Sequence, residues 1–161
     1  MTAFTAVADA GQKLAVFPID MSFPQSEEDF FSGTKGPTPD EQRRLDMVQA
    51  ELKKLLGANG RYDIVDTTAL TEKMTAVRPF YTCNGCEVDL GSEAKADLVM
   101  TGLVDKISET HLSLNVAIVD VAKGKLVSND SVLIQGNTDE SWMHGVRWLS
   151  KNRLLGEGKS Q

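Results

Sequence analysis

The sequence lacks most of the features that mark an enzyme or a nucleotide-binding protein. It contains no Gly-x-Ser-x-Gly, Gly-x-x-x-x-Gly-Lys or Gly-x-Gly-x-x-Gly motif, the patterns of hydrolase nucleophile elbows and of phosphate-binding loops. Histidine, a frequent general base and metal ligand, occurs only twice among the 161 residues. We therefore find no catalytic constellation and expect neither enzymatic activity nor a bound cofactor.

Positive charge is also scarce. The chain has 17 Lys and Arg residues against 23 Asp and Glu residues, which leaves a net charge of −6. This balance disfavours a nucleic-acid partner, which needs a basic surface to neutralise phosphates, and it includes no polybasic segment for anionic lipid. The longest apolar runs are no longer than a strand, so we expect no membrane span. A hydrophobic fraction of 41% nevertheless predicts a folded globular chain.

Cysteine is limited to one close pair, Cys83 and Cys86, in the stretch Cys-Asn-Gly-Cys. In an oxidising compartment such a pair forms a disulfide, whereas in the cytosol the same spacing indicates a redox or metal site. A c-type haem would need histidine after the second cysteine, where Glu87 stands, and the only histidines that could complete a metal site are His111 and His144. We expect a structural disulfide and keep thiol-redox or metal handling as the alternative.

The first ten residues are mostly small and apolar and end in a small-x-small pattern, Ala8-Asp9-Ala10. We interpret them as the remnant of a clipped signal peptide, and an ordinary flexible arm is the alternative. Residues 11–156 then form a single α/β domain, and residues 157–161 form a flexible tail. A signal peptide and a disulfide together point to the periplasm.

Hydrophobic periodicity predicts five strands and four helical segments. The strands are expected at 14–20, 61–66, 98–107, 112–118 and 126–135, and the helical segments at 38–57 (or to 60), 68–76, 84–96 and from 137 onward. Two β-α-β crossovers followed by an antiparallel meander make a mixed five-stranded sheet with helices packed on it. Pro18 should lie at the end of its strand or on a side without a ladder partner.

Capping signals set the expected helix starts. Thr38 and Glu41 have the spacing of a capping box, with Pro39 at the first helical position. Asn84 is expected to cap the third helical segment, which would put Cys86 in its first turn.

Two regions are candidates for contact with a partner. The segment 21–37 is long and aperiodic and includes Phe23, Phe30 and Phe31, which either fold back onto the sheet or serve as anchors for a partner. Its acidic run, residues 27–29, is contiguous and more typical of a solvated loop than of a cation site. The polar stretch 137–142 either caps the last helix or forms a recognition edge with Trp142 or Trp148 as anchor.

Several stretches resemble known periplasmic proteins. Residues 14–19, 60–66, 96–104 and 119–127 resemble the architecture shared by the N-terminal domain of the periplasmic Tol translocation protein and the curli-export lipoprotein. The Cys-Asn-Gly-Cys and Asn-Thr-Asp-Glu-Ser-Trp stretches are similar to a proteobacterial family of small secreted proteins of unknown function. The resemblance implies a fold and a compartment but lends no activity.

The sequence thus favours a non-enzymatic periplasmic accessory protein that binds another periplasmic protein. The expected contact residues are Phe23, Phe30, Phe31 and Trp142. A thiol-redox or metal-handling protein that uses Cys83 and Cys86 is the alternative. The two hypotheses differ in one observable, namely whether the cysteines are a stable disulfide or a reactive pair.

Overall fold

The apolar runs of the sequence form the five strands of one sheet. The computed structural model describes residues 11–24, 36–58 and 60–156. The strands are β1 (Gln12–Ser22), β2 (Tyr62–Ile64), β3 (Leu98–Lys106), β4 (His111–Asp120) and β5 (Lys125–Gln135). Their order across the sheet is β2-β1-β3-β4-β5. β1 is parallel to β2 and β3, and the pairs β3–β4 and β4–β5 are antiparallel, which confirms the predicted mixed sheet.

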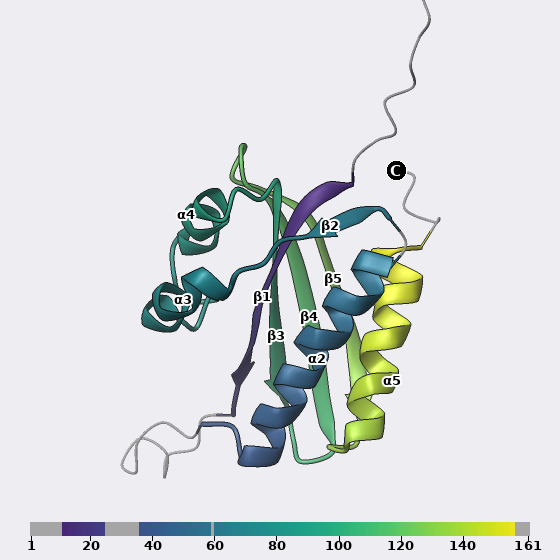
Figure 1. The fold of residues 1–161 in the computed structure, drawn as a ribbon. Coiled ribbons are helices and arrows are strands. Elements are labelled where there is room, and N and C mark those ends of the chain that lie inside the picture. The colour runs from purple at the N-terminus through teal and green to yellow at the C-terminus, as the bar shows by residue number, and fades with distance from the viewer. Residues whose placement is uncertain (1–10, 25–35, 59, 157–161) are drawn as a thin grey trace, which may run out of the picture.

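The helices cover the sheet from both sides (Figure 1). They are α2 (Pro39–Ala58), α3 (Thr71–Val77), α4 (Cys86–Glu93) and α5 (Asp139–Leu149), with a 3-10 turn at Thr68–Leu70 and a π-helical turn at Ser150–Leu154. The long helices α2 and α5 lie side by side over one face, and α3 and α4 lie together on the other. Among the helices that the structure describes, none is both long and apolar enough to cross a membrane.

The main core lies between the sheet and the pair α2 and α5. The apolar positions that recur at helical spacing in these two helices are the ones that are buried. They pack against alternate residues of the strands: Leu14, Val16, Leu98, Met100, Leu112, Leu114, Val116, Ile118 and Ile134. The side-chain period of two along a strand sends these residues to one face.

A smaller core lies under α3 and α4 on the opposite face. Ala15 and Phe17 of β1 point to this side, and the Phe17 ring packs on Phe80 with centroids 5.1 Å apart. Leu70 and Met74 complete the cover. Because β1 is buried on both faces, its sequence reads as a continuous apolar run rather than an alternating one.

The predicted capping box is present. The Thr38 hydroxyl accepts a hydrogen bond from the Glu41 N–H at 3.1 Å, and the Glu41 carboxylate accepts one from the Thr38 N–H at 3.1 Å. The prediction for the third helical segment is wrong in its cap: α4 begins after Gly85, which has φ +84°, and no side chain caps it. Glycine adopts this left-handed conformation without strain, so the chain enters α4 without a capping side chain. Cys86 is nevertheless in the first turn.

Pro18 lies inside β1, not at its end, because the strand continues to Ser22. The register between β1 and β3 shifts between Val16 and Ile19, which makes a bulge around Pro18. On the other side of β1, the pairing with β2 ends at Leu14. The missing N–H of proline therefore falls where no ladder bond is required.

Gly91 allows α4 to approach the sheet closely. A Cβ atom at this position would overlap the Val99 side chain and lie 2.9 Å from Cγ2 of Val121. We expect Gly91→Ala to lower the free energy of unfolding by about 1–2 kcal/mol, since overpacking outweighs the gain in helix propensity. Urea unfolding measures this. The neighbouring exposed position supplies the control: Ser92→Ala should change stability by less than about 0.5 kcal/mol. Equal values for the two variants would contradict the close packing.

Candidate functional site: a groove at the outer edge of the sheet

The sheet has one short edge strand and one long one. β2 covers only the first residues of β1, so the rest of that side of β1 has no strand beside it in the described chain. Side chains occupy it instead: Gln49 donates to the Val16 carbonyl at 3.1 Å, and Arg78 donates to the Ile19 carbonyl at 3.0 Å. The buried carboxylate of Asp20 accepts from Arg78 and from the Phe80 N–H, which holds Arg78 in place. This edge is protected against further strand pairing.

β5 forms the other edge, and in the described residues no strand pairs with its outer side. Just past the end of β5, the Gly136 N–H donates to the carbonyl of Thr110, the residue before β4, at 2.7 Å. Backbone groups alternate in direction along an antiparallel strand, so Gln135, Leu133 and Ser131 direct their N–H and C=O groups outward. Eleven residues of edge, with these outward groups, can accept another strand.

A groove of about 810 Å³ runs between this edge and the outer side of α5. We call it the β5/α5 groove. Its lining comes from the end of β5 and from α5: Val132, Leu133, Ile134, Gln135, Glu140, Ser141, Met143, His144, Gly145, Arg147 and Trp148. Gly145 brings the helix close to the strand, because a Cβ there would lie 2.9 Å from Cγ1 of Ile134. The groove is therefore built on two regular elements in close contact.

Two large apolar residues beside the open edge are exposed, Trp148 on the helix side and Leu133 on the sheet face away from α5, since Val132 and Ile134 are the side chains that face the helix. Leu133 is 63% exposed and Trp148 is 42% exposed. The guanidinium of Arg153 lies 5.9 Å from the centre of the Trp148 ring, a cation–π contact that orients the indole. Exposed aromatic and aliphatic side chains beside an open strand edge are typical of a protein-docking site.

Trp142, in contrast, is fully buried, so the prediction that it contacts a partner is wrong. Its ring belongs to the main core, and its indole N–H donates to the Asn137 side-chain oxygen at 3.0 Å. The helical period places Trp142 toward the sheet and Trp148 on the outer side of α5. The predicted alternative, that residues 137–142 cap the helix, is confirmed by the Thr138 hydroxyl, which accepts from the Ser141 N–H.

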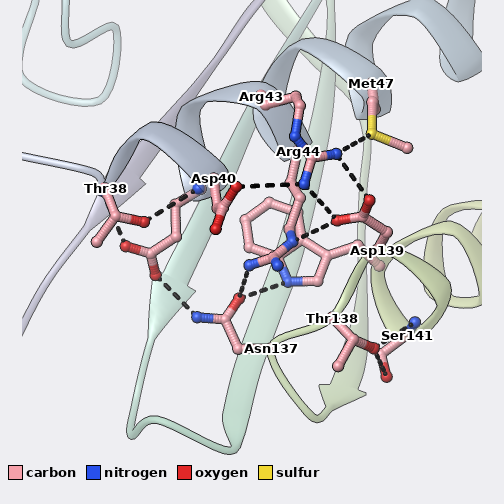
Figure 2. A network of polar contacts seen from close by, with 11 residues as sticks. Thr38, Asp40, Arg43, Arg44, Met47, Asn137, Thr138, Asp139 and Ser141 are labelled. Carbon is pink, nitrogen blue, oxygen red and sulfur yellow. Dashed lines mark hydrogen bonds and ion pairs between the residues drawn. The ribbon is translucent and has the colours of Figure 1, made fainter.

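The start of α5 is attached to α2 by a polar network (Figure 2). Asp139 accepts hydrogen bonds from Arg43 and Arg44, each at 2.7 Å. These bonds lower the pKa of Asp139 from 3.8 to about 2, and the bond from Arg43 has the larger effect. Asn137 accepts from Arg44 at 3.1 Å and so links the same arginine to the turn before α5.

At the centre of this network is the buried carboxylate of Glu41. It receives hydrogen bonds from Thr38, from Asn137 at 3.0 Å and from Lys106 at 3.0 Å. Burial by itself raises the pKa of Glu41, but the hydrogen bonds from Thr38, Lys106 and Asn137 outweigh it, and the pKa is below its ordinary value of 4.5. Lys106 also contacts the exposed Glu109 at 3.1 Å.

The disulfide joins Cys83 and Cys86 at the start of α4. Both residues are half-buried against the smaller core. Cys83, Cys86 and Glu87 offer three ligand atoms within 4.8 Å of one another, and within the described residues this group could hold a metal ion after reduction. In the oxidised pair the two sulfurs are bonded to each other and are not thiolate ligands.

The phenylalanine segment is only partly described. Phe23 is half-buried and packs against the main core, which favours the interpretation that it folds back onto the sheet. Phe30 and Phe31 lie outside the described residues. Both histidines are exposed, His111 on β4 and His144 on the groove side of α5.

The sequence patterns do not single out Leu133 or Arg147, although both line the groove, whereas Glu140 belongs to the polar stretch 137–142 that was a candidate recognition edge. One signal was available. The last strand of a meander has a free edge, and Leu133 is a large apolar residue in the polar half of that strand's alternation, between Ser131 and Gln135.

The fold and the groove define a class: an α/β module with a helix-lined open sheet edge and a structural polar network. The chain belongs to the family described as "Protein of unknown function (DUF2380)", whose model matches residues 12–154. This agrees with the resemblance to a family of unknown function, while the comparison with the Tol and curli proteins stays a prediction. None of the curated proteins is significantly similar to the chain.

Several solved structures share the fold at low sequence identity. The LpoB C-terminal domain from Salmonella enterica matches with a TM-score of 0.54 and 13% identity over 78% of this chain and 84% of its own. A PelC dodecamer from Paraburkholderia phytofirmans matches with 0.52 and 15% over 88% and 86%. Lipoprotein GNA1162 from Neisseria meningitidis matches with 0.52 and 17% over 90% and 88%. At these identities the similarity concerns the fold alone.

Removing the charge of Glu41 should destabilise the protein strongly at neutral pH. We expect Glu41→Gln to cost about 3 kcal/mol, because Lys106 loses its buried partner. Since the pKa of Glu41 is lowered in the folded protein, the carboxylate stabilises the fold above pH 4.5, and this advantage disappears as pH falls below that value. Unfolding of both proteins between pH 7 and pH 3 measures it. Glu109→Gln, which removes the exposed partner of the same lysine, should cost less than about 1 kcal/mol.

The cysteine pair should be oxidised in protein exported to the periplasm. We expect no alkylatable thiol in such protein by intact-mass analysis. The bond closes a very short loop, so Cys86→Ser should cost about 2 kcal/mol or less. Two alkylatable thiols in periplasmic material, or a reduction potential near those of thiol oxidoreductases, would contradict a structural role.

Proposed function

We propose that the protein is a non-enzymatic accessory protein of the bacterial envelope, which acts by binding a protein chain in the β5/α5 groove. The observation that carries this proposal is an open strand edge with an exposed apolar residue on each side of it, Trp148 in the groove and Leu133 on the sheet face away from α5. Edge strands are normally short, charged or covered. The free side of β1 is covered in this way by the side chains of Gln49 and Arg78. An edge left open beside apolar side chains is best explained by the binding of another protein chain there.

The ionisable groups support a non-catalytic role. Burial opposes the shifts of Glu41 and Lys106, but their hydrogen bonds outweigh it, so the pKa of Glu41 is lowered and the pKa of Lys106 is raised. The pKa of Asp139 is lowered by its arginine partners. These contacts join α2, β3 and the start of α5, which is the pattern of a structural network. Catalytic acids and bases instead have their shifted pKa values inside a substrate cleft.

Location in the periplasm is supported by two observations. Disulfides form and persist in oxidising compartments, and the chain contains one between Cys83 and Cys86. A protein of similar fold, GNA1162, is a lipoprotein, and PelC forms a dodecamer, so this fold occurs in envelope proteins and in protein assemblies. We infer that the partner is itself a protein of the periplasm.

A thiol-redox function remains the second candidate, on one observation. Cys86 is the first residue of α4, and a helix N-terminus stabilises a thiolate. The Glu87 carboxylate, 3.5 Å from the Cys83 sulfur, opposes a thiolate on Cys83. The reduction potential of the pair separates this function from the groove-binding function.

Capture from an envelope extract of the source bacterium tests the groove. A tagged bait is compared with Trp148→Ala and Leu133→Lys variants, with untagged copies of this chain counted among the captured proteins. We expect each variant to capture at least about tenfold less partner, since an aromatic or aliphatic anchor in a docking site contributes about 2 kcal/mol.

Tyr81→Ala is the matched control. Tyr81 is a large exposed side chain, 54% accessible, in the loop before α4 and away from the groove. This variant should capture as much partner as the unmodified bait. Loss of capture with Tyr81→Ala but not with the groove variants would show that the groove is not the docking site.

A further inference from the structure

We propose that Cys83, Cys86 and Glu87 form a binding site for a thiophilic divalent cation such as Zn²⁺, which is closed while the cysteines are a disulfide and opens when the disulfide is reduced. The site lies at the start of α4, on the sheet face opposite α2 and α5 (Figure 1). The proposal goes beyond the proposed function and does not depend on the β5/α5 groove. It is supported by the ligand types, their spacing, their charges and the packing of the loop.

The ligand types select the class of cation. Two sulfurs and one carboxylate oxygen lie within 4.8 Å of one another in Cys83, Cys86 and Glu87. Thiolates bind Zn²⁺ and related cations, whereas Mg²⁺ and Ca²⁺ take oxygen ligands. Three protein ligands leave the fourth tetrahedral position to water, which can reach it because the three residues are only half-buried.

The spacing of the ligands fits a tetrahedral ion. A Glu87 carboxylate oxygen lies 3.5 Å from the Cys83 sulfur. On a tetrahedral Zn²⁺ with ordinary bond lengths, a sulfur and an oxygen are also about 3.5 Å apart, and two sulfurs are about 3.8 Å apart. The Cα atoms of Cys83 and Cys86 are 5.7 Å apart, a distance that allows the reduced sulfurs to reach this separation by side-chain rotation.

The charges favour a bound cation over a reactive thiol. After reduction, the Glu87 carboxylate beside Cys83 disfavours the negative charge that a nucleophilic thiolate needs. A divalent cation between the two groups replaces this repulsion by attraction to both. Two thiolates and one carboxylate around Zn²⁺ leave one negative charge in excess. The first N–H groups of α4, which begins at Cys86, stabilise that charge.

The loop before α4 is held in place by contacts other than the disulfide. The Phe80 N–H donates to the buried carboxylate of Asp20 at 2.7 Å. Cys83 and Cys86 pack against the smaller core, in which Leu90 of α4 is buried. Because none of these contacts involves the S–S bond, we expect the three ligands to stay together after reduction.

Opening of the site is a two-electron reduction. A dithiol reductant breaks the S–S bond and transfers two electrons and two protons to Cys83 and Cys86, while the dithiol itself becomes a disulfide. Zn²⁺ then displaces the two thiol protons, which pass to solvent, and forms two Zn–S bonds. Oxidation of the pair removes both thiolate ligands and releases the ion.

Zinc binding by the whole chain in its two redox states tests the proposal. The protein is reduced with a dithiol, which is then removed without air, and is titrated with ZnCl₂ in a calorimeter beside the oxidised protein. We expect the reduced chain to bind one Zn²⁺ with a Kd of about 1 µM or tighter, and the oxidised chain to bind at least about a hundredfold more weakly. Co²⁺ should give the intense visible absorption of a tetrahedral thiolate site with the reduced chain alone.

Glu87→Gln tests the carboxylate ligand. We expect the affinity of the reduced chain for Zn²⁺ to fall about tenfold or more, because a neutral amide is a poorer ligand than a carboxylate. Asp89→Asn is the matched control, since Asp89 is an exposed acid of the same helical turn and lies outside the ligand group. Its affinity should stay within about twofold of the unmodified protein. Equal melting temperatures of the two metal-free variants show that both are folded.

Three results would overturn the proposal. They are equal affinities of the oxidised and reduced chains, equal affinities of Glu87→Gln and Asp89→Asn, and one Zn²⁺ shared by two chains. The last result would mean that cysteines of different copies hold the ion. Tight one-to-one binding that needs both reduction and the Glu87 carboxylate supports the site.

Discussion

The buried carboxylate of Glu41 is the contact on which the arrangement of the two long helices depends. It accepts hydrogen bonds from Thr38 at the start of α2, from Asn137 before α5 and from Lys106 at the end of β3. A carboxylate removed from water is costly unless all of these bonds form, so the three elements have to meet at one point. The bonds are also the reason why the pKa of this group is low despite its burial.

The position of the groove depends on these contacts of Glu41, because they fix where α5 begins. Because Glu41 accepts from the amide nitrogen of Asn137, the amide oxygen faces the other way and accepts from Trp142 and Arg44. Trp142 is thereby held in the core and α5 begins at a defined place against α2. From this start the helix passes over β5, where Gly145 permits close contact, and its outer side forms one wall of the groove.

The two sides of the sheet differ in protection: side chains cover the free side of β1, whereas the outer side of β5 is open. This difference is the reason to regard the groove beside β5 as a binding site. On the β1 side, Gln49 and Arg78 bind backbone carbonyls that have no neighbouring strand. On the β5 side, the outward groups lie beside Leu133 and Trp148, which are exposed. An unprotected edge risks unspecific association unless a specific partner covers it.

Much of the fold was predictable, because local signals agreed with the tertiary structure. The five strands, their mixed sheet and the capping box of Thr38 and Glu41 follow from periodicity and spacing. The errors have physical reasons. Gly85 begins α4 through its positive φ, so Asn84 is not needed as a cap. Trp142 was expected to be a surface anchor, but the period of α5 turns it into the core.

Composition and local spacing were enough to predict the class of the fold, the acidic character of the chain and the close cysteine pair, since each depends on composition or on neighbours a few residues apart. Tertiary structure alone decided the site. The end of β5 and α5 line one groove because α5 folds back over the last strand, and the open edge exists because β5 is last in the sheet order. Contacts between segments far apart in the chain leave no periodic pattern. They arise from how helices and strands pack, and local sequence does not encode that packing.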